Sequence, residues 1–517
     1  MRTGWSSAGR DRRIASFRFR VEAPIEALRG RGHPVEVFDP ASAHLYDVVV
    51  FCKRYSPDDL ALARAVRDRG GRVILDLCDN HFHNPLDLPK YRQAREEIRA
   101  MAELAHAVVC STAALATVVE TETGGAVQPL VIGDTIEPLN LAAPSRPVPS
   151  EPLRLTWFGS HGSPNAVSGV GDLALIRDEL ETLAAETPTV LTVCSNSREK
   201  YDACVAGFGL PTRYVEWSLE RFPAVLAATD AALLPISVNP FTACKTHNRL
   251  TTALYAGVPV LASTIDSYRE FAPFCRLDDW SAGLQALVDQ PARERERARA
   301  ARPYIERRWT MQTLAPRWEA ALGLPTPKAA RDAWRDVKLH GRLDAVARSA
   351  VTGWVAAPGR PDLPLQVALD CDGDIVALAF ADQPREDLRR AGLDQACGFS
   401  LPIPPARRRA RRMTVRVLEA EWVVGMDPIL RDEEGPWRTW RPAAGDTRWD
   451  VSEVIAAQER LLADFTQMRR ERDVAARRVS RAFLQASDAR PDRVETARPS
   501  LLRDLLRAGW DDQDTAP

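Results

Sequence analysis

The sequence predicts two consecutive doubly wound α/β domains, then a small all-β sandwich-like domain and a C-terminal helical tail. Short β-rich runs alternate with helical patterns twice along the chain, and a third series holds only short strands and turns. Strict alternation of β and α elements is typical of parallel sheets covered by helices. The expected divisions are a first domain over 1–137, a linker over 138–152, a second domain over 153–323 and a β domain over 337–431.

The first domain is expected to alternate five strands with four helices. Strand patterns lie at residues 33–38, 47–51, 72–77 and 107–110, with a weaker one near 3–6; helical patterns lie at 19–29, 57–69, 88–103 and 112–122. The run at 47–51 is apolar after Asp47 and shows little alternation, which is typical of a strand buried on both faces of a parallel sheet.

The second domain repeats this pattern after a segment rich in proline. Prolines at 138, 144, 147, 149 and 152 exclude helix and central strand there, so we expect an interdomain linker. Strands are expected at 153–158, 190–194, 213–217, 230–235 and 259–262, and helices at 172–186, 198–208, 219–228, 245–256, 280–289 and, interrupted, 291–322. Two Rossmann-like domains of this kind bind ligands at the carboxyl ends of their strands.

The remaining chain differs in kind. Short strands separated by turns over 337–431 predict a small β-sandwich, and the Asp-rich stretch 370–374 is better explained as a hairpin turn than as a calcium site. Residues 450–485 form an amphipathic helical pattern, suited to self-association or to a solvated arm. Residues 486–517 are expected to be mostly disordered.

Composition excludes several classes of protein. The 517 residues are 45% hydrophobic and 27% charged, which excludes fibrous and wholly disordered chains. The 69 basic and 70 acidic residues give a formal charge of −1, so no nucleic-acid partner is expected. The nine cysteines are scattered without a C-x-x-C pair, and no apolar run approaches membrane-spanning length. We expect a cytoplasmic protein, with peripheral contact to the inner face of the membrane as a further option.

A glycine-containing loop follows the first strand of the second domain. Gly159, Ser160 and His161 lie between that strand and a helix, where exposed backbone N–H groups and the helix dipole favour an anion. A tight strand-to-helix connection without a ligand explains the same residues equally well.

A second feature lies at residues 240–260. Lysine occurs only six times in the chain, and Lys245 is expected to open a helix that carries Asn248 and Arg249 one turn on. Cations at a helix start oppose the helix dipole, so a bound diphosphate would compensate them. Solvated charges are the alternative.

This pattern resembles a known family. Two doubly wound domains, a Pro-rich linker and the run from Ala256 to Ser263 (AGVPVLAS) resemble GT-B glycosyltransferases of group 1, family 4-like. The resemblance implies that the second domain holds a nucleotide-diphosphate-sugar donor and the first an acceptor. It also implies that helix N-termini and basic side chains neutralise the diphosphate, with neither metal nor cofactor.

The chain departs from that family at four positions. Two glutamates common in the family fall at Cys244 and Thr252, and an Arg and a Lys fall at Ser160 and His161. We expect Lys245 and Arg249 to supply the missing positive charge. The expected donor-binding set is Gly159, Ser160, His161, Lys245, Asn248, Arg249 and Thr252.

The first domain offers two groups of candidates. Arg18 and Arg20 lie at the position of a family loop that faces the interdomain cleft, and either is a candidate phosphate contact; a solvated basic loop is the alternative. Asp79 and His81 follow a strand within a polar run and are the candidates for acceptor chemistry. A polar loop without chemistry is the alternative. A metal site is disfavoured because no helical ligand motif accompanies them.

The third domain is similar to an accessory domain of bacterial glycosyltransferases, through residues 351–355, 381–388, 391–392 and 398–399. Its Trp354 fits a core position better than a sugar platform. The expected function is therefore hexosyl transfer from a nucleotide sugar to a glycan or lipid-linked acceptor in bacterial polysaccharide or cell-envelope synthesis. The alternatives are a non-catalytic glycan- or nucleotide-sugar-binding scaffold and a nucleotide-sugar 2-epimerase.

Overall fold

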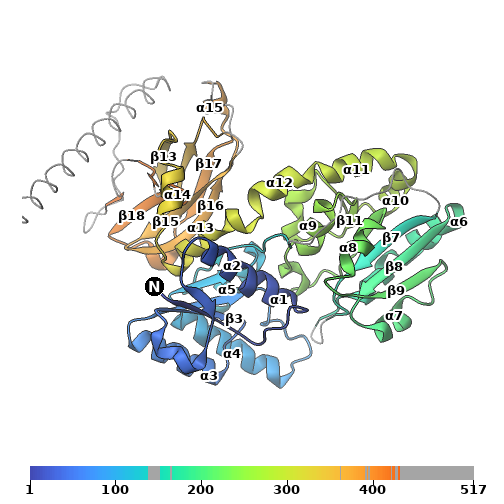
Figure 1. Ribbon diagram of the computed structural model, residues 1–517, viewed down its shortest axis with the longest axis horizontal. Helices are drawn as coiled ribbons and strands as arrows, with labels where there is room; N and C mark the ends of the chain where they lie inside the picture. Colours follow the sequence, from blue (N-terminus) through green and yellow to red (C-terminus); the bar gives the residue numbers. More distant parts are fainter. Residues whose placement is uncertain are drawn as a thin grey trace, which may run out of the picture. The chain divides into compact units, whose positions relative to one another are not determined.

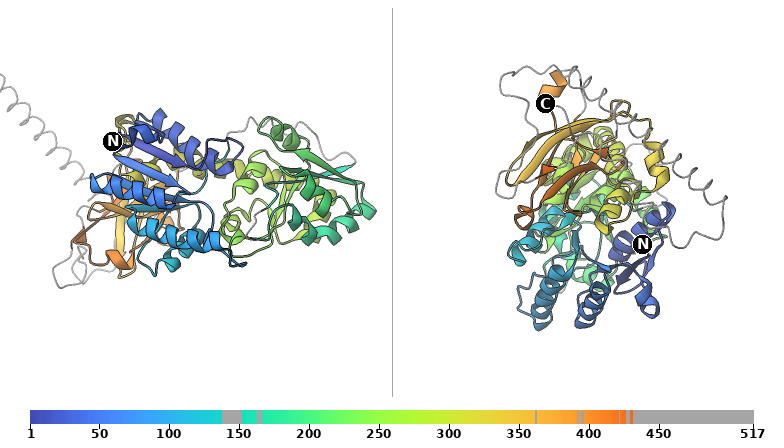
Figure 2. Two further views of the ribbon diagram at one scale, coloured as in Figure 1. Left: turned by 90° about the horizontal axis from the view of Figure 1, so that it is seen from below. Right: turned by 90° about the vertical axis from the view of Figure 1, so that its left-hand side faces the viewer.

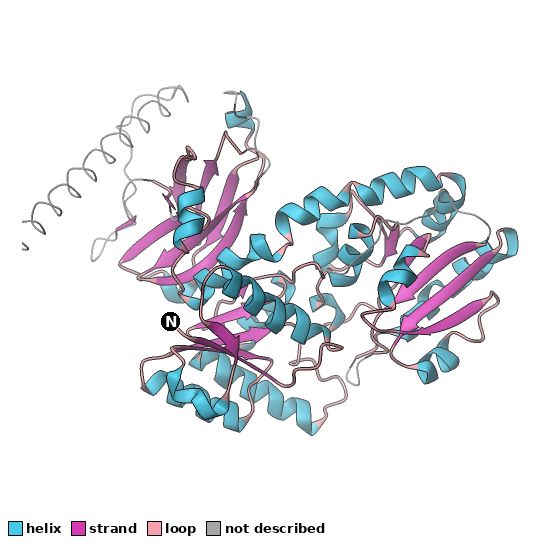
Figure 3. Cartoon of the chain, viewed as in Figure 1, coloured by secondary structure: helices cyan, strands magenta, loops and turns pink. Residues whose placement is uncertain are grey.

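The computed structural model describes residues 1–137, 152–162, 166–360, 363–390, 393, 396–420, 422–425 and the backbone of 429–430. Nearly all of the expected linker, the tail helix over 450–485 and the tail over 486–517 lie outside these residues. The predicted fold class is confirmed by two parallel α/β sheets and an antiparallel β module (Figures 1 and 3).

The first sheet is parallel, with strand order β2-β1-β3-β4-β5-β6. Its strands are β1 (Thr3–Ser7), β2 (Val35–Val37), β3 (Val48–Cys52), β4 (Arg72–Leu77), β5 (Ala107–Cys110) and β6 (Leu130–Val131). All five residues of β3 are buried, as its uninterrupted apolar run predicts. The two-residue β6 is too short to show a pattern in the sequence.

Helices cover both faces of this sheet (Figures 1 and 2). One face carries α1 (Ala15–Phe17), the π-helical turn η1 (Arg18–Glu22) and α2 (Ala23–Gly30); the other carries α3 (Pro57–Asp68), α4 (Pro89–Leu104) and α5 (Ala113–Glu122), and the short turn η2 (Pro40–Leu45) precedes β3. Local sequence sets these boundaries: Ser56 and Asp59 form a reciprocal capping box at the start of α3, with Pro57 at its first position.

The second sheet is also parallel, with order β12-β11-β10-β7-β8-β9. Its strands are β7 (Leu153–Phe158), β8 (Thr189–Ser195), β9 (Thr212–Glu216), β10 (Ala231–Leu234), β11 (Val260–Ala262) and β12 (Arg276–Leu277). Its helical elements are η3 (Val170–Ile176), α6 (Arg177–Glu186), α7 (Arg198–Cys204), α8 (Phe222–Ala227), η4 (Thr242–Cys244), α9 (Asn248–Tyr255), η5 (Asp266–Phe271), α10 (Trp280–Asp289), α11 (Pro291–Arg299) and α12 (Ala301–Arg308).

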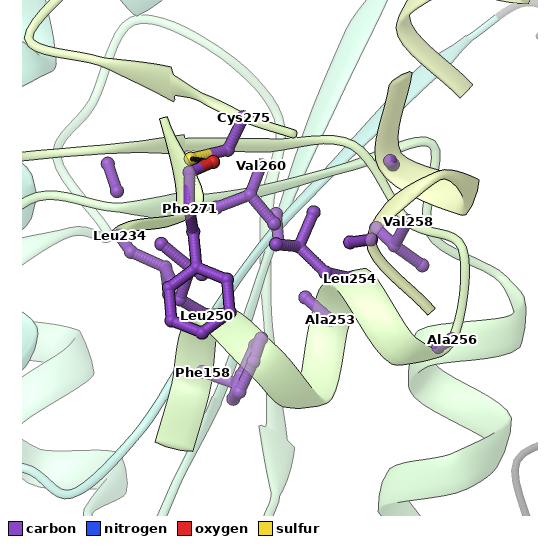
Figure 4. Packing of buried hydrophobic residues seen from close by; sticks show 14 of the residues in the cluster. Phe158, Leu234, Leu250, Ala253, Leu254, Ala256, Val258, Val260, Phe271 and Cys275 are labelled. Atoms are coloured by element: carbon purple, nitrogen blue, oxygen red, sulfur yellow. Dashed lines mark hydrogen bonds between the residues drawn. The ribbon is translucent and has the colours of Figure 1, made fainter. Parts of the chain in front are cut away.

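Helix α9 begins three residues later than the sequence predicts. Lys245 has extended backbone angles (φ −67°, ψ 150°) and follows the separate turn η4. The Asn239 side-chain oxygen accepts hydrogen bonds from the backbone N–H groups of Phe241 and Thr242 and so starts that turn independently of α9. Lys245 therefore lies in a connecting turn, and the expectation that it opens the helix is wrong. Leu250 and Leu254 anchor α9 in the core of the second domain (Figure 4).

Helix α13 (Met311–Leu322) packs on the first sheet, although the sequence groups it with the second domain. Trp318 is fully buried, and its ring meets that of Trp5 on β1 edge-on, with centroids 5.4 Å apart. Gly323 ends the helix with φ +71°, a conformation that glycine adopts without strain.

The β module consists of two antiparallel sheets around one core. One sheet has the order β13-β14-β17 and the other contains β16-β15-β18-β19, with β20 paired to β18; the short helix α14 precedes the module, and α15 and the turn η6 lie within it. Their bounds are α14 (Lys328–Ala333), β13 (His340–Val346), β14 (Ala350–Ala356), β15 (Leu365–Cys371), β16 (Asp374–Ala381), α15 (Glu386–Arg390), β17 (Gly398–Pro402), η6 (Pro405–Arg407), β18 (Arg412–Val417), β19 (Trp422–Val423) and β20 (Ile429–Leu430). Trp354 is buried on β14, as expected for a core residue.

The module is bonded to α13 through buried polar groups. Arg317 donates to the side-chain oxygen of Gln366 (2.5 Å), and Gln366 donates to the backbone carbonyl of Thr313 (2.7 Å). The Phe380 ring of β16 contacts the guanidinium groups of Arg308 and Arg317, whose Cζ atoms lie 4.2 and 4.1 Å from its ring centre. Helix α13 is thus held by the first sheet on one side and by the β module on the other.

A buried ion network connects three separate segments of the first domain. Arg20 of η1 is 1% exposed, and its guanidinium pairs with Asp76 at the end of β4 and with Asp134 beyond β6. It also donates to the Ile132 carbonyl (2.7 Å) and lies over the Trp318 ring at 5.1 Å. The two carboxylates raise the pKa of Arg20 despite its burial.

Replacing Arg20 with methionine is expected to lower the free energy of unfolding by about 3–5 kcal/mol, since two buried carboxylates lose their cation. Denaturant unfolding of the full chain measures the loss. The matched control is Arg12→Met, which removes the more exposed Arg12–Glu22 pair and is expected to cost less than about 1 kcal/mol. Equal losses in the two variants would contradict a special role for Arg20.

Among the described residues, no helix is both long and apolar enough to cross a membrane.

Candidate functional site

A short segment of the second domain, residues 240–249, bonds to the carboxyl edge of the first sheet. The Pro240 carbonyl accepts from the Asn80 side chain (2.9 Å), and the Cys244 carbonyl accepts from the Thr112 hydroxyl (3.0 Å). Cys244 itself is 2% exposed and packs in the core of the first domain. The segment therefore carries its charged residues directly to the strand ends of the other sheet.

Asp79 lies between two lysines from different domains. Its carboxylate pairs with Lys53 Nζ at 2.8 Å and with Lys245 Nζ at 2.5 Å, and Lys245 also lies 4.2 Å from the Phe241 ring centre. Burial favours the neutral acid, but the two ammonium groups outweigh it and hold the pKa of Asp79 well below its usual range. Asp79 is thus a fully ionised bridge across the domain boundary.

His81 lies beside this bridge without joining it. Its Nδ1 is hydrogen-bonded to the Tyr55 hydroxyl, and the two rings meet edge-on. Burial lowers the pKa of His81 to about 4, because it outweighs the opposing effect of the Asp79 carboxylate, and the nearby lysines act in the same direction as burial. The imidazole is therefore neutral near pH 7 and can accept or donate a proton depending on its tautomer.

On the second domain, the structure brings Arg249 to the predicted glycine loop. The guanidinium lies so close to Gly159 that a Cβ there would be 3.2 Å from Arg249 Nη1. The same guanidinium is 5.9 Å from the ring centre of Trp157, the residue before the end of β7. Arg249 is half-buried, and no ion pair to it occurs among the described residues. It is a cation at a strand end without a matching carboxylate.

Two backbone hydrogen bonds of His161 hold the loop after Gly159. His161 accepts from the Val170 N–H (3.4 Å), while its own N–H donates to Asn196 Oδ1 (2.8 Å). A Cβ on Gly169 would be 2.4 Å from the His161 carbonyl oxygen, so this close approach requires glycine there. Ser160 and His161 remain exposed, and residues 163–165 lie outside the described part of the loop.

Asn248 and Thr252 have internal partners. The Asn248 side chain donates to Asp134 Oδ2 (2.7 Å), and the Thr252 hydroxyl donates to the Asn248 carbonyl (2.7 Å). The two positions where the family places glutamates, Cys244 and Thr252, are both buried. Neither carries an acidic group that could contact a ribose or a sugar.

The two arginines of the first domain differ. Arg18 pairs with Glu137 and lies 5.1 Å from the ring centre of Trp217, at the end of β9, so it reaches the second domain. Arg20 has its guanidinium bonded to Asp76 and Asp134 in the core and does not reach the surface. Of the two arginines, only Arg18 therefore remains a candidate for contact with a phosphate.

Sequence reasoning missed Asp134, Tyr55 and Trp217, which the structure places beside predicted site residues. Asp134 follows the short β6, and Trp217 follows β9. Treating the residues after every strand of the two sheets as site candidates would have identified both. Tyr55 carries no comparable signal. Among the described residues, no cluster of three or more His, Cys, Asp or Glu side chains is arranged to hold a metal ion.

The structure contains two Rossmann-like domains, each with a parallel sheet. Helix α13 then returns to the first domain. The architecture is of the GT-B type. No known protein-family model and no curated protein matches the sequence. Several solved structures are similar in fold at low identity.

S. aureus TarM is 11% identical, with a TM-score of 0.40. The match spans about half of each chain, 52% of this one and 53% of TarM. Anabaena HepE in complex with UDP is 15% identical over 62% of this chain and 100% of that chain, with a TM-score of 0.45. An α,α-trehalose-phosphate synthase (UDP-forming) from Burkholderia vietnamiensis is 10% identical over 59% and 80%, with a TM-score of 0.39. These are likenesses of fold alone.

The buried His247 makes the stability of this region depend on pH. It is 4% exposed and packs against Phe271 and Trp309, and burial lowers its pKa to about 4. The unfolded chain, with a histidine pKa of 6.5, binds more protons than the folded chain between these values. Stability contributed by the neutral ring is thus present above pH 6.5 and is lost as the pH falls toward 4.

Between pH 7 and pH 5, the free energy of unfolding is expected to fall by about 2 kcal/mol less in His247→Phe than in the original chain. Phenylalanine keeps the packing and does not titrate. Urea unfolding at the two pH values measures the change. The control is His44→Phe, at a less buried site whose substitution is expected to leave the pH dependence unchanged. An unchanged slope for His247→Phe would show that this residue does not govern acid sensitivity.

Proposed function

We propose that the chain is a glycosyltransferase that moves a hexosyl group from a nucleotide-diphosphate sugar to a glycan or lipid-linked acceptor. The observation that carries this proposal is Arg249, a half-buried arginine without an ion-pair partner among the described residues, held against Gly159 at the carboxyl end of β7. A partly buried cation at a strand end of a parallel sheet is suited to an anionic ligand. Biosynthesis of polysaccharide or cell envelope in bacteria is part of the same proposal.

In this proposal, Arg249 and Lys245 hold the donor diphosphate, and the loop Gly159–Ser160–His161 lies beside it. Negative charge accumulates on the diphosphate as the bond to the sugar breaks, so fixed cations stabilise the transition state more than the ground state. Arg18 is the candidate for a further contact from the first domain. These cations take the role that a divalent metal has in other transferases.

Asp79 and His81 are proposed to act on the acceptor. While Lys53 and Lys245 both pair with Asp79, its pKa is too low for a useful base. A bound diphosphate competes for Lys245, and the withdrawal of that ammonium group raises the pKa of Asp79. Asp79 would then accept the acceptor proton only when the donor is present, with the neutral His81 positioned next to it.

One observation favours a second candidate, a protein that binds a nucleotide sugar or glycan without turning it over. The two family glutamates are replaced by the buried Cys244 and Thr252, whose side chains are engaged internally. Calorimetric titration with UDP-, GDP-, ADP- and dTDP-sugars, followed by assays of hydrolysis and transfer on any donor that binds, separates the candidates. Binding without release of the sugar would favour the scaffold.

Arg249→Met is expected to weaken donor binding by about 10- to 100-fold, because a charge-assisted contact to phosphate is lost. Lys245→Met is expected to act in the same direction but less strongly, since Asp79 competes for that lysine. Calorimetry with the tightest-binding nucleotide sugar measures both. Arg302→Met, which removes an exposed arginine paired with Glu306 on α12, is the control and should leave affinity unchanged. Unchanged affinity in Arg249→Met would overturn the assignment.

Asp79→Asn is expected to lower kcat by about 100-fold or more while donor affinity stays the same or rises, because the base is lost and the lysines are released. Steady-state kinetics with the identified donor and acceptor separate kcat from donor binding. Asp58→Asn, at an exposed aspartate in the first turn of α3, is the control. If kcat survives in Asp79→Asn, the carboxylate serves only as the bridge between the lysines.

A further inference from the structure

A groove of about 480 Å³ lies between α4, α5 and the loop that follows Asp79. Its volume is in the range of sites that take small molecules. Asn80 lines it and directly follows Asp79 in the chain, while Pro240 closes one side from the second domain. The groove therefore starts at the domain boundary that carries the lysine-paired carboxylate.

The walls of this groove are fixed in advance by side-chain hydrogen bonds. Asn84 accepts from the Leu88 N–H and donates to the Leu88 carbonyl, both at 2.9 Å, so the loop over 84–88 is tied closed. Asn80 accepts from the Phe82 N–H (3.1 Å) and donates to the Pro240 carbonyl (2.9 Å). A ligand entering the groove does not have to order these segments, which favours affinity.

The charges lining the groove cancel in pairs. Arg95 forms a two-point pair with Glu122 (2.8 and 2.9 Å), and Arg92 pairs with Asp87 (3.2 Å). Such pairs offer both donors and acceptors to hydroxyl groups but leave little net charge for an ionic ligand. Tyr91, which lines the same groove, supplies a partly exposed aromatic ring, and its hydroxyl has no hydrogen-bond partner among the described residues.

We propose that this groove binds the acceptor, and that the acceptor is the uncharged end of a glycan. An aromatic ring beside paired polar groups matches the alternating C–H faces and hydroxyl edges of a pyranose. The inference rests on the proposed transferase function, because the groove becomes an acceptor site only if the second domain holds a donor. It adds the chemical class of the acceptor and the residues that recognise it.

Saturation-transfer NMR on the full chain tests the proposal. The probes are the methyl glycosides and disaccharides of glucose, galactose, mannose, rhamnose and N-acetylglucosamine, with methyl glucuronide and methyl galacturonide as charged comparisons. At least one neutral probe is expected to bind, and Tyr91→Ala should weaken it by about tenfold through loss of the ring face. Thr121→Trp, at an exposed groove position on α5, is expected to block the groove and abolish binding.

Gln93→Ala is the matched control, since Gln93 is exposed on α4 and does not line the groove. Binding of no neutral probe, binding of uronides alone, or neutral binding that survives both Tyr91→Ala and Thr121→Trp would overturn the proposal. Calorimetry with nucleotide sugars on the same samples distinguishes its failure from failure of the proposed function. Donor binding without glycan binding rejects the groove alone, whereas absence of donor binding rejects the transferase.

Discussion

The buried charge of Arg20 is the constraint on which the domain boundary depends. The Arg20 guanidinium is 1% exposed, and Asp76 and Asp134 balance its buried charge from two different strand ends. The second oxygen of Asp134 accepts from Asn248, the first residue of α9. The ion network in the core of one domain thereby fixes the start of the helix that carries Arg249 in the other.

The charges around this boundary are unevenly balanced. Asp79 satisfies Lys53 and Lys245, whereas Arg249 has no carboxylate among its described neighbours. An incoming diphosphate would therefore meet Arg249 at no cost in broken ion pairs, but it must compete with Asp79 for Lys245. In the proposed reaction, this order of events would make the ionisation of Asp79 respond to the donor, and it would require residues of both domains.

Much of the fold was predictable from local sequence, and the site was predictable only in part. Apolar runs such as residues 48–51 predict buried parallel strands without knowledge of their neighbours. The start of α9 was not predictable from helical pattern, because one side chain, Asn239, organises a separate turn before it. The burial of Arg20 depends on Asp76 and Asp134, which lie 56 and 114 residues away, and no spacing rule connects such distant residues. The return of α13 to the first sheet likewise depends on the contact between Trp318 and Trp5.

The segment over 240–249 links the two halves of the proposed reaction mechanically as well as electrostatically. Pro240 forms part of the groove wall, Cys244 is packed in the first-domain core, and Lys245 pairs with Asp79 and is the proposed donor contact. Because the first domain holds both the carbonyl and the side chain of Cys244, a displacement of Lys245 toward a diphosphate would strain the turn that also contains Pro240. Coupling of this kind is reciprocal: whatever factor the donor contributes to acceptor affinity, the acceptor must contribute to donor affinity. In the proposed reaction, the ten residues from Pro240 to Arg249 would join the groove and the Arg249 site into one binding unit.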